Sequence, residues 1–429
     1  MQKIPQNIKI RGKSKQLAYQ LILFLLQPFL LLIISLKNYK AEWAKNSVWL
    51  ITIFYGLTFA IAPDSTADSV RYAARLEQMY YSDFTLSMLI SMFFVPGGYT
   101  DIYQPLLTYI VSRFTSDYSV LFGVFGFVLG YFYSRNIWYT IKLTDNKLNQ
   151  YTVLLIFVFA FIVSISSGIN GVRMWTGAHI FVFGLFVYFL DGRKYGVIIA
   201  LSSILVHFSY VAPAILLLFY LVAGNRLVIY YIIFVFSYFI GQIDFEIGRQ
   251  IASLFPAYIE DGTSGYIGES REQSFMAQER ERVWFMTLNS VAFPLAILLL
   301  SSYLFIFKRK FIENVQYLHN LFAFGLLFYG VFNIFGFYPS VGRFLSPAGM
   351  ILFAVFIGYI ANYKISFRKN DNRFLWIILL VSPALLLNLA IAVRVFLGNA
   401  SYLFFIGNPL FAPFLHSDMG IYEFIRQLI

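Results

Sequence analysis

Long apolar stretches recur along almost the whole chain, and this feature constrains the fold most. Many of them are long enough to cross the hydrocarbon core of a bilayer, about 30 Å thick. Only helices or closed barrels satisfy the backbone there, and runs that are continuous rather than alternating argue against a barrel. The composition agrees, with 59% hydrophobic and 12% charged residues. We therefore expect an all-α polytopic membrane protein of about 10 to 12 transmembrane segments, forming one integral membrane domain over residues 1–429.

The charge and cysteine content exclude several classes of protein. The formal net charge is +11, but much of the surplus lies in short loops, where it sets orientation and favours anionic lipid head groups. Nucleic acid is therefore not expected as a partner. The chain has no cysteine, which excludes disulfides, thiol catalysis and cysteine-based metal sites. It also has no P-loop motif and no His/Cys cluster, so neither a cofactor nor a metal is expected.

Charge in the loops predicts which segments lie outside the cytoplasm. Residues 63–103 form a polar external segment, residues 244–282 the largest hydrophilic loop, and residues 398–429 an apolar-aromatic external tail. The loop at 244–282 is too long for a plain turn, which favours a lid or binding loop. The first apolar run, residues 17–36, contains Pro28 and either crosses the membrane or is re-entrant; we leave these alternatives open.

The remaining apolar runs predict the membrane segments. These are residues 47–62, 104–114, 117–140, 151–168, 172–190, 227–243, 283–307, 318–337, 345–363 and 374–396. Residues 196–222 either cross once or form a hairpin of two half-helices around His207. Only the hairpin keeps the later basic loops inside, so the positive-inside rule favours it. Half-helices of this kind commonly line substrate sites in transporters.

Two arginines stand between apolar runs without basic neighbours. Arg173 lies in GINGVRMW, after Asn170, and Arg343 lies in YPSVGRFL. A guanidinium at an embedded helix end is costly unless it faces an anion or a water-filled cavity, although an interfacial anchor is the simpler alternative. The N–H groups at the start of a helix also favour anions. We expect Arg173, Arg343 and Asn170 to bind a phosphate or diphosphate.

Three further residues are candidates for chemistry. His207 stands at the apex of the predicted hairpin, where a histidine can act as a general base, donate to a phosphate oxygen or simply bond a neighbouring carbonyl. Asp68 and Arg71 lie on one face of a predicted helix. They either pair with each other on a solvated surface or supply a carboxylate base and a cation to a substrate.

Four segments together resemble a known family. They are ADSVRYAARLE, IYQPLLTYIVSRF, the block from SSGINGVRMW to HFSYVAPAILLLFYL, and VGRFLSP. In this order they resemble the Wzy/EpsG-type bacterial polysaccharide polymerases, closely over roughly residues 50–225 and loosely elsewhere. Two positions depart from the family pattern. Gln104 stands where a glutamate commonly precedes the proline, and Met174-Trp175 follows Arg173 where a glutamine is usual.

The resemblance implies an enzyme of the bacterial inner membrane with C-type glycosyltransferase (GT-C) architecture. Such an enzyme binds two undecaprenyl-diphosphate-linked glycans on the external, periplasmic side. It transfers the growing chain from its carrier to the non-reducing end of a fresh repeat unit, without a cofactor or metal. By analogy Arg173 and Arg343 would bind diphosphate, and His207 would assist at the diphosphate or act as base. Asp68 is the alternative base, and whether a chain-length regulator also binds is left open.

Two other functions compete with this expectation. An O-antigen ligase shares the architecture and the donor but uses a lipid A-core acceptor. A lipid-linked oligosaccharide flippase or another transporter would show a repeated two-bundle organisation, and the sequence shows no internal repeat.

Overall fold

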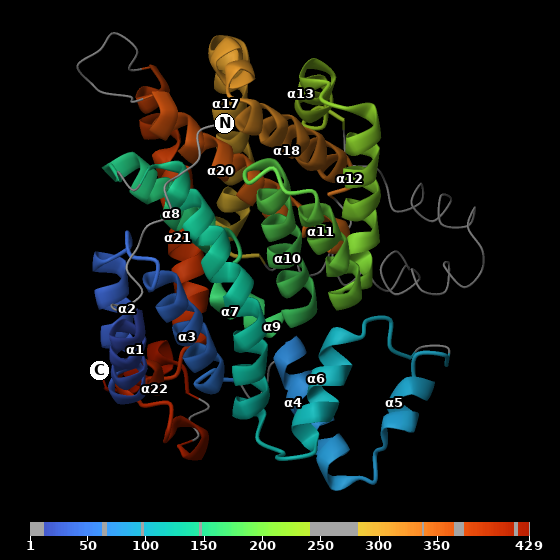
Figure 1. Ribbon diagram of the computed structural model, residues 1–429, viewed down its shortest axis with the longest axis vertical. Coiled ribbons are helices and arrows are strands. Elements are labelled where there is room, and N and C mark those ends of the chain that lie inside the picture. Colours follow the sequence, from blue (N-terminus) through green and yellow to red (C-terminus); the bar gives the residue numbers. More distant parts are fainter. Residues whose placement is uncertain are drawn as a thin grey trace.

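The computed structural model describes residues 13–61, 67–95, 98–145, 148–240, 282–336, 339–363, 373–415 and 419–428. Within these ranges every regular element is a helix (Figure 1). Extended pairing is limited there to two isolated bridges, Phe59 with Ala400 and Ser401 with Gly420. The all-α expectation is confirmed. The predicted loop at residues 244–282 lies outside the described residues, apart from residue 282.

The helices, in chain order, are α1 (Lys13–Leu26), α2 (Pro28–Lys37), α3 (Ala44–Leu57), α4 (Asp68–Tyr81), α5 (Leu86–Ser91), α6 (Tyr103–Ser112), α7 (Tyr118–Leu143), α8 (Gln150–Ile162), α9 (Ile165–Asn170), α10 (Val172–Phe189), α11 (Tyr195–Val206), the 3₁₀ turn η2 (Phe208–Tyr210), α12 (Val211–Ala223), α13 (Leu227–Phe236), α17 (Trp284–Asn314), α18 (Gln316–Ile334), α19 (Pro339–Gly342), α20 (Leu345–Tyr363), α21 (Arg373–Asn399), α22 (Leu403–Ile406), the 3₁₀ turn η3 (Ala412–Phe414) and α23 (Ile421–Leu428).

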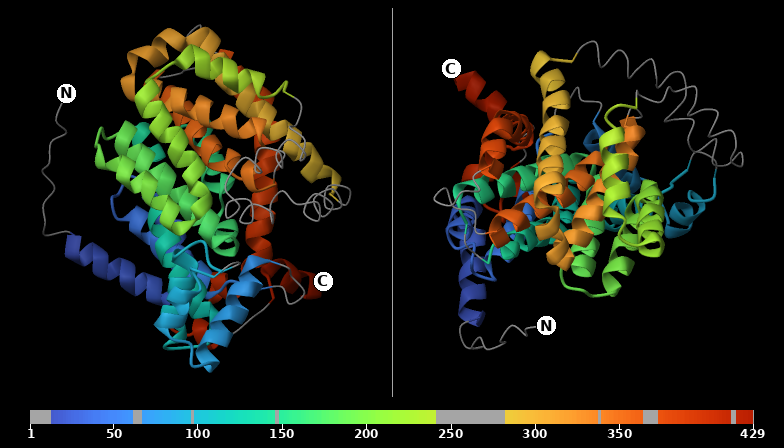
Figure 2. Two further views of the ribbon diagram at one scale, coloured as in Figure 1. Left: turned by 90° about the vertical axis from the view of Figure 1, so that its right-hand side faces the viewer. Right: turned by 90° about the horizontal axis from the view of Figure 1, so that it is seen from above.

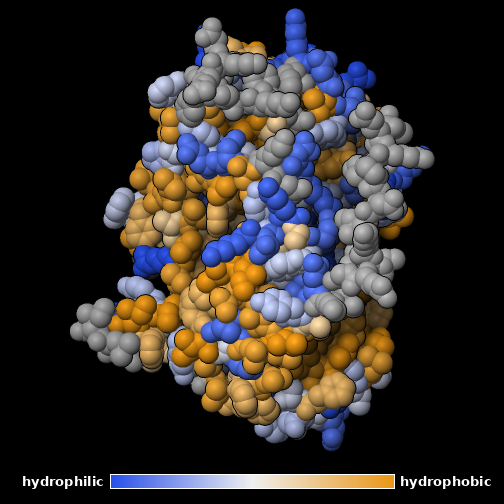
Figure 3. Space-filling model, turned by 60° about the vertical axis from the view of Figure 1, so that its left-hand side comes forward, coloured by the Kyte–Doolittle hydropathy of each residue, from blue (hydrophilic) through white to orange (hydrophobic). Residues whose placement is uncertain are grey.

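Six stretches of helix are long and apolar enough to cross a membrane. They are Tyr118–Leu143, Gln150–Asn170, Val172–Phe189, Trp284–Lys310, Gln316–Ile334 and Arg373–Asn399. Six shorter apolar helices accompany them in the described chain, so the length criterion alone does not reach the expected 10 to 12 segments. Many large apolar side chains are exposed, and Figure 3 shows broad apolar areas on one face. Surfaces of this extent suit lipid rather than water. The chain is therefore an all-α protein with the character of a polytopic membrane protein.

Two apolar runs are interrupted by helix breaks that the sequence analysis did not place. The run over residues 17–36 is divided at Gln27, whose side chain accepts a hydrogen bond from the Phe29 amide at the start of α2. Figure 2 shows α1 projecting from the body of the molecule. The predicted span over residues 151–168 is likewise divided after Ile162, and Ser164 caps the short helix α9. In each case a side-chain oxygen accepts a hydrogen bond from a backbone N–H group in the first turn of the new helix, where that group has no backbone acceptor.

Helices α10 and α11 pack closely against each other near the centre of the bundle. Their backbones meet at two glycines. A Cβ atom on Gly184 would lie 2.4 Å from the Ala200 nitrogen, and one on Gly196 would lie 2.5 Å from the Gly184 oxygen. The Arg193 amide, in the turn between them, donates to the Val187 carbonyl oxygen at 3.1 Å. The two helices are therefore antiparallel, and small residues set their spacing.

Helix α12 reverses the chain again and runs parallel to α10. At its start the Tyr210 hydroxyl donates to the Met174 carbonyl oxygen at 3.0 Å, near the first turn of α10. At its other end the Tyr220 ring contacts Phe189, the last residue of α10, with ring centroids 5.8 Å apart. Helices α11 and α12 are thus the two arms of a hairpin with His207 at its apex, as the sequence predicted.

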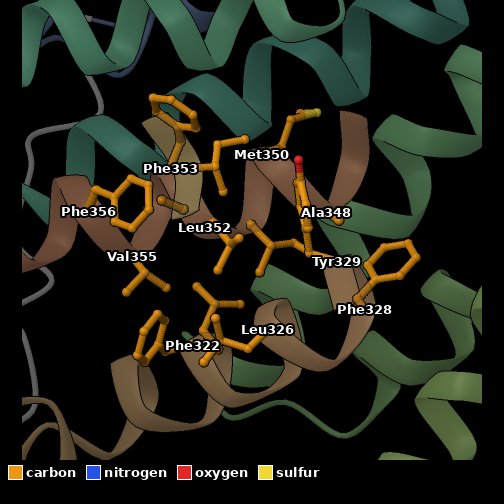
Figure 4. Close-up of a cluster of buried hydrophobic side chains, with 14 of the residues drawn as sticks. Phe322, Leu326, Phe328, Tyr329, Ala348, Met350, Leu352, Phe353, Val355 and Phe356 are labelled. Carbon is orange, nitrogen blue, oxygen red and sulfur yellow. The ribbon is translucent and has the colours of Figure 1, made fainter. Parts of the chain in front are cut away.

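The main hydrophobic core joins α18 and α20 to α8, α10 and α13. Figure 4 shows its centre, where Phe322, Leu326 and Phe328 of α18 face Leu352 and Phe356 of α20. A second core packs α3 and α7 against the segment that follows α21, including Phe404. These two cores hold α10 and the hairpin rigidly beside α7 and α18.

Helices α4, α5 and α6 form a small layer at one end of the bundle (Figure 1). Helix α6 contacts both α10 and α11 there, and α4 contacts α9. Helix α6 stops at Arg113, and Asp117 begins α7 by accepting a hydrogen bond from the Ser119 amide at 2.8 Å. The layer therefore lies against the start of α10 and the apex of the α11–α12 hairpin.

Candidate functional site

A buried carboxylate joins the α4–α6 layer to the start of α10 and to the hairpin. Asp101 lies just before α6, and its side chain is 1% exposed. Its Oδ2 atom accepts from Nη1 of Arg173 at 2.9 Å and from Nδ1 of His207 at 2.8 Å. Its Oδ1 atom accepts from the Phe208 backbone amide at 2.6 Å. One carboxylate therefore holds three groups that come from two other parts of the chain.

These contacts keep Asp101 ionised. Burial by itself would raise the pKa of this carboxyl group. The hydrogen bond and charge of His207, the Phe208 amide and the Arg173 guanidinium outweigh burial and hold the pKa below its usual value of 3.8. A buried carboxylate that accepts several hydrogen bonds and faces a cation is expected to behave in this way. The group at the centre of the site is therefore an anion at neutral pH.

The charge of Asp101 also determines the orientation of the His207 ring. An ionised carboxylate can only accept hydrogen bonds, so Nδ1 of His207 must carry the proton that is shared with Oδ2. The side-chain hydrogen bond of His207 among the described residues is the one through Nδ1, so the opposite ring nitrogen, Nε2, stays open, and the side chain is 14% exposed. In the neutral ring Nε2 is an acceptor, and in the protonated ring it is a donor. Asp101 thus presents one defined ring nitrogen of His207 to a ligand.

Asp101 accepts a hydrogen bond from only one of the N–H groups of Arg173. It lies in the first turn of α10, its side chain is 34% exposed, and one hydrogen bond, from Nη1, joins it to Asp101. The Tyr72 hydroxyl of α4 lies beside the guanidinium but makes no hydrogen bond of ordinary geometry. The remaining N–H groups of Arg173 can therefore bind an oxyanion, although Asp101 already offsets its charge.

The structure brings two of the predicted site residues together and places the others outside their hydrogen-bond cluster. Arg173 and His207 come together on Asp101. Asn170 lies close by but accepts, through Oδ1, a hydrogen bond from the Ser69 amide at 3.2 Å. That contact fixes the start of α4 on α9, so the Asn170 oxygen positions a helix, whereas the sequence analysis assigned the residue to anion binding.

Asp68 and Arg71 pair with each other across one turn of α4. The Arg71 side chain is 70% exposed and that of Asp68 is 26% exposed. Neither is hydrogen-bonded to Asp101 or His207 in the described structure. Their arrangement is that of a solvated surface ion pair, one of the two alternatives that the sequence left open.

Arg343 lies at the same end of the bundle but outside the Asp101 cluster. Its side chain is exposed, between α19 and α20. The next residue, Phe344, packs on Tyr210 with ring centroids 5.2 Å apart. Tyr210 follows His207 by three residues, so the Arg343 backbone is close to the hairpin apex. No described contact joins its guanidinium to the cluster.

Sequence reasoning missed Asp101 as a site residue. The residue is separated from Arg173 by 72 positions and from His207 by 106, so no local spacing connects them. One signal in the sequence could have identified it. Asp101 stands beside a predicted apolar helix, and an acidic residue that is buried in such a place is expected to be paired with a cation. In a chain with unpaired arginines between apolar runs, such a residue is a candidate partner for them.

The described residues contain no group of three or more His, Cys, Asp or Glu side chains placed to hold a metal ion. Their chemistry at the site consists of one carboxylate, one imidazole and one guanidinium. Comparison with family models, with curated proteins and with solved structures finds no match to this chain.

Proposed function

We propose that this protein is a glycosyltransferase that polymerises lipid-linked polysaccharide repeat units. In this proposal it moves a growing glycan from undecaprenyl diphosphate to the non-reducing end of a new undecaprenyl-diphosphate-linked unit. The observation that supports this most is the convergence of Asp101, Arg173 and His207 at one end of an apolar helical bundle. That arrangement offers a ring nitrogen and guanidinium N–H groups at a position that a membrane-anchored phosphate ester can reach.

The residues suit the reaction in the following way. Nε2 of neutral His207 accepts the proton of the acceptor sugar hydroxyl while that oxygen attacks the anomeric carbon of the donor. The bond between the anomeric carbon and the diphosphate oxygen breaks, and the diphosphate leaves with the electron pair. Arginine N–H groups stabilise the negative charge that develops on this leaving group. Asp101 stabilises the imidazolium that forms on His207. The imidazolium later releases its proton.

The location follows from the same proposal. In this proposal the enzyme lies in the inner membrane of a bacterium, with the α4–α6 layer and the site on the external face, and the long apolar helices support a membrane location. The proposal also includes a GT-C architecture and a reaction that requires neither a cofactor nor a metal. The partners would be the two lipid-linked glycans and the bilayer itself.

The proposal is tested by glycan gels from a strain that lacks the gene and is complemented with wild type or Arg173→Ala. We expect deletion to reduce a ladder of chain lengths to a single repeat-unit band. Wild type should restore the ladder and Arg173→Ala should not. Arg193→Gln, at the opposite end of α10, carries the same loss of charge and should restore the ladder fully.

Two outcomes would replace the proposal. If deletion removes all surface glycan, including the single-unit band, a ligase or a flippase explains the result better. If Arg173→Ala restores a full ladder at equal protein level, the Asp101 cluster is not the site of transfer.

A further inference from the structure

We propose that Arg75 is the phosphate-binding cation of this site and that it depends on the neutrality of Gln104. The identity of the anion as a lipid-linked diphosphate rests on the proposed function, whereas the anion site itself does not.

The first argument concerns charge. Arg173 faces the Asp101 carboxylate at 2.9 Å, and Arg71 is paired with Asp68. A guanidinium that already faces a carboxylate adds little net positive potential for a second anion. Arg75 differs from both, because within the described chain it makes no ion pair. Its charge is not offset by a carboxylate among the described residues.

The second argument concerns how Arg75 is held. Its Nη1 atom donates to Oε1 of Gln104 at 3.2 Å, and its Cζ atom lies 4.8 Å from the centre of the Tyr99 ring. Gln104 is 1% exposed and is fixed in turn, because its Nε2 atom donates to the Thr108 hydroxyl at 2.8 Å. An amide and an aromatic ring orient the guanidinium without neutralising it. Most of its N–H groups stay available.

The third argument concerns position. Tyr72 lies beside Arg173, and Arg75 follows Tyr72 by three residues on α4, a rise of about 4.5 Å. Gln104 follows Asp101 by three residues, so their Cα atoms lie at most about 11 Å apart. Arg75 is therefore about one helical turn from the Asp101 cluster. Two linked phosphate groups suit this spacing, one at Arg75 and one at Arg173.

Gln104 is the residue that decides whether Arg75 can bind an anion. A glutamate at this position would present a carboxylate to Arg75 across the same 3.2 Å contact. The resulting ion pair would resemble that of Arg173 with Asp101, and the external anion would have to compete with it. Gln104→Glu should therefore abolish anion binding while Arg75 itself remains in place.

The experiment measures binding by isothermal titration to the purified full-length protein in an uncharged detergent. The two probes are inorganic pyrophosphate and farnesyl diphosphate, and neither requires turnover. The variants are Arg75→Gln and Gln104→Glu. Arg193→Gln, at the other end of the bundle, is the control for loss of one positive charge.

We expect Arg75→Gln and Gln104→Glu to bind at least about tenfold more weakly than wild type, since charge-assisted hydrogen bonds are lost. Arg193→Gln should stay within about threefold of wild type. If both probes follow this pattern, the diphosphate alone is recognised. If only farnesyl diphosphate binds, and binds through Arg75, the lipid-linked form is the ligand.

Wild-type affinity in Arg75→Gln would overturn the inference, as would wild-type affinity in a folded Gln104→Glu. If Gln104→Glu does not fold, Arg75→Gln decides the question alone. The proposed function can fail separately: Arg75-dependent binding by a protein that forms no glycan ladder would preserve the anion site and remove the polymerase. A protein that forms a glycan ladder but binds the anion without Arg75 would preserve the polymerase and remove the anion site.

Discussion

Asp101 is the single residue on which the geometry of the site depends. It is almost completely buried, and its two oxygens fix His207, Arg173 and the backbone at the hairpin apex. Removing one partner from a buried ion pair costs more than the pair itself contributes, because the remaining charge has lost its compensation. The effect is moderated here, because the Arg173 side chain is 34% exposed and solvent can screen it.

Asp101→Asn should lower the free energy of unfolding by about 2 kcal/mol at neutral pH. The pKa of Asp101 lies below its usual value of 3.8 in the folded protein. A depressed carboxyl pKa contributes stability that is complete above the unfolded value and is lost as the pH falls through the folded value. The advantage of wild type over Asp101→Asn should therefore be constant down to roughly pH 5 and disappear at lower pH.

The measurement is thermal unfolding of both proteins in detergent between about pH 2 and pH 5. A stability difference that stays constant over the whole range would show that Asp101 is not the ionised centre described above.

At the scale of single residues the sequence identified part of the site. Arg173 and His207 were found because each interrupts an apolar run, which is a local signal. Asp101 was missed because its partners are distant along the chain, and the expectation that Asn170 binds an anion stays a prediction. The Asn170 side chain bonds the Ser69 amide, 101 positions earlier, and no spacing rule predicts such a contact.

Among the helices, the close pairing of α10 and α11 positions the site. It holds the start of α10, with Arg173, and the end of α11, before His207, at the same end of the bundle. The contact relies on Gly184 and Gly196, where added Cβ atoms would meet backbone atoms at 2.4 to 2.5 Å. Backbone cannot move aside as a flexible side chain can, so a larger residue must separate the two helices.

Gly184→Ala should lower the free energy of unfolding by about 1 to 3 kcal/mol, although alanine favours a helix more than glycine does. Gly349→Ala, in α20, is the matched control. Its added Cβ would meet only two isoleucine methyl groups at 3.7 Å, and helix propensity should make it neutral or slightly stabilising. Thermal unfolding in detergent compares them, and equal melting temperatures would contradict close backbone packing at Gly184.

The positions of the helices were largely predictable, but their breaks were not. Apolar runs set the bounds of α7, α10, α18 and α20 to within a few residues, because lipid-spanning helices need continuous apolar sequence. The breaks at Gln27 and after Ile162 depend on side-chain caps within apolar runs. The hairpin at His207 was predicted from loop charges rather than from its own residues.

For the molecule as a whole, several arginines lie at one end of the bundle. Arg75 and Arg173 lie at the α4–α6 layer. Arg343 is brought there by the contact of Phe344 with Tyr210. Arg394 of α21 lies close to the same end, because the nearby Asn399 donates to Ser166 of α9 at 2.8 Å. The side of the membrane that this end faces stays a prediction.

The central claim is that the Asp101 cluster transfers glycans between lipid diphosphates, and a purified polymerisation assay tests it most directly. The full-length protein in nanodiscs is supplied with lipid-linked repeat units as its only substrate. Wild type and Arg193→Gln should produce a ladder of chain lengths, and His207→Ala should reduce the rate at least about 100-fold. Arg173→Ala should also be impaired, and Arg343→Ala tests whether the exposed arginine contributes. No ladder from wild type, or full activity in both Arg173→Ala and His207→Ala, would contradict the claim.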